Sequence, residues 1–71
     1  MVTKQYRLER VFGQRKANGD WPTVGWKANV THGLMDVEYL GGGRVWEKQA
    51  QARAAAKEHA ARTGVTPIIL T

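Results

Sequence analysis

The clearest strand pattern of the chain lies in residues 24–39, which read VGWKANVTHGLMDVEY. Apolar and polar residues alternate on both sides of His32-Gly33, which is typical of two half-buried strands joined by a tight turn. Lys27 and Glu38 would then meet on the outer face, with opposite charges. The inner face would hold three apolar pairs: Val30 with Met35, Ala28 with Val37, and Trp26 with Tyr39. We therefore predict an antiparallel hairpin over these residues.

The residues before this hairpin predict one more strand and a long loop. Residues 2–12 alternate less regularly, with Tyr6 and Leu8 inward and an irregularity or strand end at residues 10–12. Residues 13–23 contain Asn18-Gly19, a strong turn signal. We expect this segment to be a loop, and loops of such length in small domains are often functional.

The residues after the hairpin predict a helix and a final strand. Three glycines at 41–43 end the sheet, and residues 45–63 are rich in Ala, Gln, Glu, Lys and Arg, which favour a helix. Its start lacks a strong capping residue, so that Gly43 is the candidate, and Gly64 suits its end. Residues 65–70 then predict a short strand, at an edge because Pro67 has no N–H to donate.

The predicted fold is a single α+β domain over residues 1–71. It consists of a three-stranded antiparallel meander, one Ala-rich helix packed on the sheet and a short C-terminal edge strand (βββαβ). Ala52, Ala56 and Ala60 would face the sheet one helical turn apart. The bulky residues expected against them are Phe12, Trp26, Met35 and Tyr39. A second stripe of small residues beside Trp46, or the last strand, would allow a homodimer.

Composition argues against several classes of function. The chain has 71 residues without cysteine or serine, so it lacks the two commonest catalytic nucleophiles, disulfides and thiolate metal ligands. His32 is expected in the turn and His59 on the solvated helix face, and neither shows metal-ligand spacing. No apolar run is long enough for a membrane span or a signal segment. We expect a cytoplasmic binding protein without catalytic activity, metal or cofactor.

The net charge of +5 arises from 11 Lys and Arg against 6 Asp and Glu. It favours an acidic partner, although a similar charge serves solubility alone. The basic residues form three candidate sets, each of which would otherwise be ordinary solvated surface. The first is Arg15 and Lys16 with the stacking surface of Trp21, the second is Arg7 and Lys27 on the outer sheet face, and the third is Arg44, Lys48, Arg53 and Lys57 on the glycine turn and helix.

The stretch GGGRVWEKQAQARAAAK, residues 41–57, resembles the C-terminal half of a double-stranded RNA-binding domain. That family passes from strands through glycines to an Ala-rich helix whose first turn carries phosphate-binding lysines. The resemblance covers about residues 26–61 and implies that Arg44 and Lys48 contact phosphate. In the present chain the lysine cluster is reduced to Lys48, the family's first helix is absent and a last strand is added. The order of three strands then a helix also resembles the sheet-reading DNA-binding domains of phage integrases and plant ethylene-response factors.

We therefore expect a small basic domain that binds DNA or RNA with weak sequence preference. The alternative is a protein-binding inhibitor or adaptor that acts on an acidic surface of a host complex. The size and alanine bias resemble those of orphan accessory proteins of bacteria and their phages, and an anti-CRISPR protein or a polymerase-binding factor would fit. The sequence leaves open the choice between DNA, RNA and protein.

Overall fold

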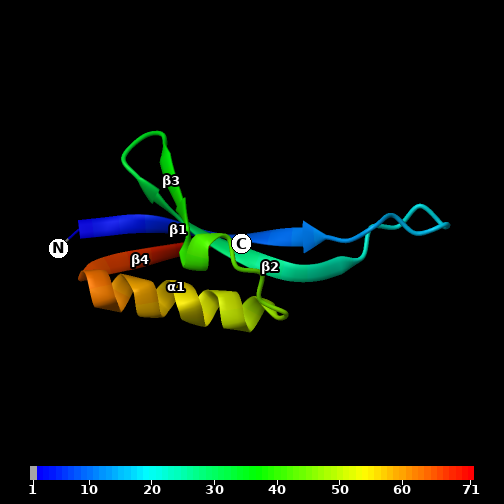
Figure 1. The fold of residues 1–71 in the computed structure, drawn as a ribbon. Coiled ribbons are helices and arrows are strands. Elements are labelled where there is room, and N and C mark those ends of the chain that lie inside the picture. The colour runs from blue at the N-terminus through cyan, green and yellow to red at the C-terminus, as the bar shows by residue number, and fades with distance from the viewer. Residues whose placement is uncertain (1) are drawn as a thin grey trace.

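One mixed sheet and one helix make up the computed structural model, which describes residues 2–71. The sheet has the strand order β3-β2-β1-β4, in which β1 is antiparallel to β2, β2 is antiparallel to β3, and β4 is parallel to β1 (Figure 1). The strands are β1 (Val2–Phe12), β2 (Thr23–His32), β3 (Asp36–Tyr39) and β4 (Val65–Leu70). The α+β class is confirmed, and the sheet is mixed because β4 extends the meander beside β1.

The helix α1 (Gln49–Thr63) covers one face of the sheet (Figure 1). Ala52, Ala56 and Ala60 are buried against it, as predicted, because methyl side chains allow a close approach of helix and sheet. Gly64 ends the helix with φ 72°, and its N–H donates to the carbonyls of the last turn. The helix begins at Gln49, four residues later than the predicted start at residue 45.

The late start of α1 has a local cause. Trp46 pairs with Trp26 of β2 through two backbone hydrogen bonds of 2.7 Å, so the chain is extended there. The helix is then capped at Lys48, whose N–H donates to Gln51 Oε1 at 3.0 Å, and not at Gly43. A 3-10 turn that the sequence did not predict, η1 (Leu40–Gly42), connects β3 to this segment.

The predicted register between β2 and β3 is wrong. The turn has three residues at 33–35, so that Val30 pairs with Glu38 in place of Met35, a shift of three residues. An odd shift reverses the faces of a strand. Val37 and Tyr39 therefore lie on the open face of the sheet, away from α1, and the predicted pairing of Lys27 with Glu38 does not form.

The core differs accordingly from the prediction. Its larger side chains are Tyr6, Leu8, Val30 and Leu40, and Trp26 packs partly against them. The other three expected core residues are exposed, Phe12 by 53%, Met35 by 90% and Tyr39 by 41%. The new register buries Leu40 and keeps Met35 in the turn, which explains why Leu40 belongs to the core and Met35 does not.

The β1–β2 hairpin extends well past α1 and makes the molecule elongated, with dimensions of 49 × 23 × 19 Å (Figure 1). We call residues 11–24 the arm. The predicted irregularity near the end of the first strand is confirmed by a register shift between Val11 and Phe12. In the described residues, no helix is long and apolar enough to cross a membrane.

Candidate nucleic-acid interface

The tip of the arm is a closed loop held by backbone hydrogen bonds. Gly13 N–H donates to the Pro22 carbonyl and Lys16 N–H to the Asp20 carbonyl, both at 2.8 Å. Gly19 has φ 91°, which favours glycine, and its N–H donates to the Lys16 carbonyl at 3.0 Å. The predicted turn at Asn18-Gly19 is therefore confirmed, and the loop has a defined shape.

This loop brings the first predicted set together. Arg15 and Lys16 are exposed on one side of the turn, and Trp21 on the other side is 57% exposed. The nearby carboxylate of Asp20 accepts a hydrogen bond from Asn18 Nδ2 at 3.1 Å. One loop thus carries two exposed cations and an exposed indole ring, which is the combination that binds phosphate and base.

Arg10 is a basic residue that belongs to none of the three predicted sets. Its guanidinium carbon lies 5.4 Å from the centre of the Trp26 ring and 6.0 Å from that of Phe12. Such distances allow cation–π attraction, which holds the guanidinium in a preferred place. The available signal was its parity: Arg10 follows Tyr6 and Leu8 on the inward side of β1, where a charge is unusual.

Arg44 and Lys48 flank Trp46, which pairs with Trp26 of β2. Because this pairing is antiparallel, Lys48 lies toward the arm and Arg44 lies away from it. Arg44 is stacked on Trp46, with its guanidinium carbon 5.5 Å from the ring centre. The segment reaches this place because Gly25 has no side chain: a Cβ there would lie 2.8 Å from the Trp46 carbonyl oxygen. Arg44 and Lys48, which belong to the third predicted set, are both exposed.

The open face of the sheet carries Arg7 and Lys27 together with an acid. Glu9 pairs with Lys27 across the strands, and its two oxygens accept hydrogen bonds from Asn29 Nδ2 at 2.9 Å and from the Tyr39 hydroxyl at 3.1 Å. The ammonium of Lys27 lies 5.7 Å from the Tyr39 ring centre. A fixed carboxylate within this second set makes it less suited to phosphate than the arm.

The bond between Glu9 and Tyr39 predicts a measurable titration. The hydrogen bond and the negative charge of Glu9 raise the pKa of the Tyr39 hydroxyl above its ordinary value of about 10. The unfolded chain releases this proton first, so the stabilisation from this bond is present below pH of about 10 and lost as pH rises through the folded pKa. We expect Glu9→Gln to lower the midpoint of tyrosinate absorbance, and Tyr39→Phe to remove the shifted titration. An unchanged midpoint in Glu9→Gln would contradict this contact.

The structure does not bring all predicted basic residues onto one surface. Arg53 and Lys57 are exposed on α1, a helical turn and more beyond its start, and extend along the helix away from the arm. The arm and its base are therefore the candidate interface, with Arg10 added to the residues that the sequence indicated.

Both histidines lie away from the tip of the arm and differ from expectation. His32 ends β2 and is not a turn residue, and its Nε2 lies 3.0 Å from Glu38 Oε1. His59 is not a solvated residue, because its Nδ1 bonds the buried Tyr6 hydroxyl at 2.8 Å. Lys4 Nζ lies 2.7 Å from His32 Nδ1, so this ring nitrogen accepts and Nε2 donates. These groups connect β1, β2, β3 and α1.

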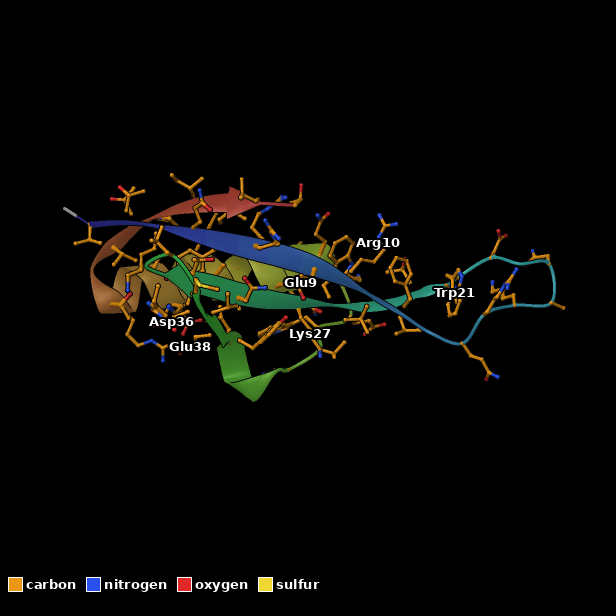
Figure 2. All side chains as sticks on the ribbon, turned by 90° about the horizontal axis from the view of Figure 1, so that it is seen from above. Glu9, Arg10, Trp21, Lys27, Asp36 and Glu38 are labelled. Carbon is orange, nitrogen blue, oxygen red and sulfur yellow. The ribbon has the colours of Figure 1, made fainter. Side chains whose placement is uncertain are left out.

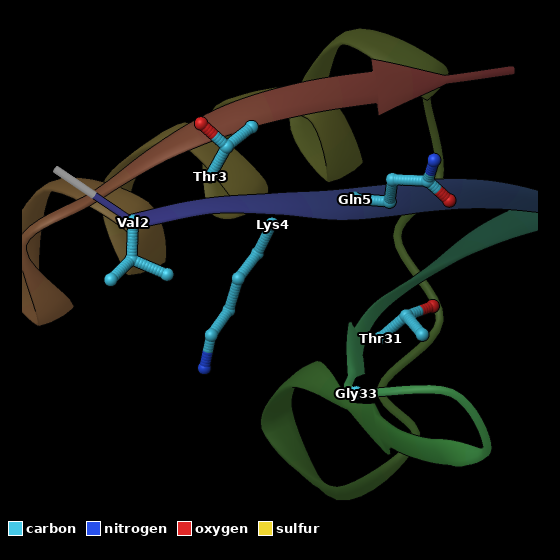
Figure 3. Close-up of a pocket in the computed structure, with 6 residues that line it drawn as sticks. All are labelled: Val2, Thr3, Lys4, Gln5, Thr31 and Gly33. Atoms are coloured by element: carbon cyan, nitrogen blue, oxygen red, sulfur yellow. The ribbon is translucent and has the colours of Figure 1, made fainter.

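Two further observations concern this end of the sheet. A hollow of about 370 Å³ is lined by Lys4, Thr31 and Gly33 among others, and the Lys4 side chain extends toward the β2–β3 turn (Figure 3). Within residues 2–71, no group of three or more His, Asp or Glu side chains could hold a metal ion.

In comparisons with known proteins, no family model, no curated protein and no solved structure matches this chain.

Proposed function

We propose that this chain is a small nucleic-acid-binding domain that uses its arm and the base of the arm to bind the phosphate backbone. The observation that supports this function best is that, in the part of the chain that the structure describes, the lysines and arginines are not paired with carboxylates. Among residues 2–71, no Lys or Arg side chain lies within ion-pair distance of an Asp or Glu, and the contacts within that distance join Glu38 to His32 and His59. No Asp or Glu side chain of these residues thus competes with an external polyanion for the basic side chains.

The placement of acids supports the same surface. Asp36 and Glu38 lie toward one end of the molecule, whereas Arg10 and Trp21 lie toward the other end (Figure 2). The Glu38 carboxylate is hydrogen-bonded to His32 and lies 4.0 Å from His59. The Glu9 carboxylate accepts hydrogen bonds from Asn29 and Tyr39. A polyanion at the arm would therefore meet cations and exposed rings, and it would be remote from the β3 carboxylates. The arm itself carries one carboxylate, that of Asp20, which accepts a hydrogen bond from Asn18.

The residues of the arm do not form a set that constitutes a base-reading code. Arg15 and Lys16 are flexible cations, and Trp21 presents a ring that stacks on any base. We accordingly propose weak sequence preference. The competing function, binding to an acidic protein surface, would use the same cations but would not require the exposed rings.

The test is a titration of labelled duplex DNA, duplex RNA and single strands at two or more salt concentrations. We expect Arg15→Gln/Lys16→Gln to weaken binding about tenfold and to reduce the slope of log K against log salt by about 2, because two phosphate contacts are lost. Circular dichroism should be unchanged, since both side chains are exposed.

The matched control is Arg53→Gln/Lys57→Gln, which removes the same charge from α1. We expect its slope to stay within about 0.5 of that of the parent chain. Equal losses in both variants would contradict the arm as the interface. Absence of binding to every nucleic acid at low salt would overturn the proposed function and favour the acidic protein partner.

A further inference from the structure

Two hollows, one near the base of the arm and one along α1, share one construction. The first, of about 400 Å³, is lined by Arg10, Trp26 and Gln49 together with Leu8 and Thr71. The second, of about 250 Å³, is lined by Arg44 and Trp46, and also by Glu58, His59 and Arg62. Each contains one arginine within 5.5 Å of the ring of one tryptophan. We call them the Arg10 hollow and the Arg44 hollow.

The two hollows are neighbours because their tryptophans are paired. Trp26 and Trp46 exchange two backbone hydrogen bonds, which makes them directly opposite residues of adjacent extended segments. Side chains of such pairs lie about 5 Å apart at Cβ. Arg10 in turn pairs with Trp26 on the other side. Backbone pairing thus places Arg10, Trp26 and Trp46 on three adjacent segments, and Phe12 lies beside Arg10 as Arg44 lies beside Trp46. We call these five residues the row.

We propose that this row binds two successive unpaired nucleotides of a single strand, one at each hollow. The inference rests on the proposed nucleic-acid function and specifies its substrate class. Rings and guanidinium planes are the surfaces on which unpaired bases stack, and the arginines also provide donors for phosphate. The two tryptophans are half-buried in their hollows, so a base must leave its own stack to reach them.

A duplex is a poor ligand for this row. Its bases are stacked on one another and present only their edges, so the tryptophan faces would meet no base. The one carboxylate in the Arg44 hollow, Glu58, would repel a phosphate but can accept a hydrogen bond from a base amino group. The Arg10 hollow has no Asp or Glu in its lining among the described residues, so we assign the phosphate contact chiefly to Arg10.

Tryptophan fluorescence can test this proposal directly. In a Trp21→Phe background, Trp26 and Trp46 are the only remaining tryptophans. We expect an oligothymidylate of about eight nucleotides to quench their emission, and a duplex of the same length to leave it nearly unchanged. Quenching that is equal for both ligands would overturn the proposal.

Arginine variants separate stacking from charge. We expect Arg10→Gln to weaken single-strand binding about 5- to 150-fold, the range for loss of one stacked base, and to weaken duplex binding much less. Arg10→Lys keeps the charge without the planar group, and we expect it to recover only part of the loss. The control for charge is Arg53→Gln on α1, with an expected change of less than about twofold.

The outcomes distinguish this inference from the function on which it rests. Duplex and single-strand binding that fall equally in Arg10→Gln, or full recovery by Arg10→Lys, would show that Arg10 is only a charge, and the row would be excluded as a stacking site. Binding of the duplex without binding of the single strand would overturn the inference while the proposed function stood. Loss of both at low salt would overturn both.

Discussion

Replacement of Ala56 by leucine is expected to lower the free energy of unfolding by about 3 kcal/mol, because α1 packs on the sheet through methyl groups. Ala56 is fully buried, and it lies in a row with Ala52 and Ala60. A leucine there must push the helix away from Tyr6 and Val30, which are fully buried beneath it. For a domain of this size we expect a melting temperature at least about 10 °C lower, measured by circular dichroism.

The control for this prediction uses the same substitution on the same helix. Ala54 lies on the solvent side of α1 and is exposed. Leucine is nearly as good a helix former as alanine, so Ala54→Leu should change the stability by less than about 0.5 kcal/mol. A similar loss in both variants would mean that the contact of α1 with the sheet is not close, and the described packing would be wrong.

A second large effect is expected at Gly25, where the segment that precedes α1 crosses β2. In Gly25→Ala the new Cβ would lie 2.3 Å from Val45 Cγ1 and 2.8 Å from the Trp46 carbonyl oxygen. The first atom belongs to an exposed side chain that can rotate, but the second is backbone held by the Trp26 pairing. We expect a loss of about 2 kcal/mol in the free energy of unfolding, measured by urea denaturation.

Two variants sharpen this second prediction. Val45→Ala in the Gly25→Ala background relieves the contact with Cγ1 and should restore less than half of the loss, since the carbonyl contact stays. Gly13→Ala also meets a valine methyl, that of Val24 at 2.6 Å, but no backbone atom closer than 3.8 Å. We expect its cost to be below about 1 kcal/mol. Equal costs at both glycines would contradict the tight crossing at Trp46.

The Gly25 crossing also links stability to the candidate site. It places Trp46 opposite Trp26, and therefore the stacked pair of Arg44 and Trp46 beside β2. A displaced crossing should separate the two hollows, so Gly25→Ala is expected to weaken single-strand binding more than binding through the arm tip. The contrast can be measured with the same fluorescence titration at a temperature at which the variant is folded.

Local sequence patterns were sufficient to predict several elements of the structure. The alanines at 52, 56 and 60 identified the packed face of the helix, because one helical turn determines which side chains share a face. Asn18-Gly19 and Gly64 identified a turn and a helix end, since both require a conformation that glycine adopts readily. The basic loop with Trp21 was likewise visible in the residues themselves.

Contacts between distant segments decided the rest. The pattern at residues 24–39 satisfied two registers. The burial of Leu40 together with the hydrogen bond between Glu38 and His32 favours the register that the two-residue turn did not predict. Trp46 left the expected helix because its backbone pairs with Trp26. Arg10 became a candidate site residue only when the pairing of β1 with β2 placed it on an aromatic ring.

By itself, the sequence determined the α+β class, the face of the helix that packs on the sheet, the loop at the arm tip and the excess of positive charge. These depend on spacing along the chain and on the conformational freedom of single residues. The tertiary structure alone decided the β2–β3 register, the pairing of the two tryptophans and the row that joins Arg10 to Arg44. Those depend on which residues meet across the sheet, and in a small core a shift of three residues reverses which side chains are buried.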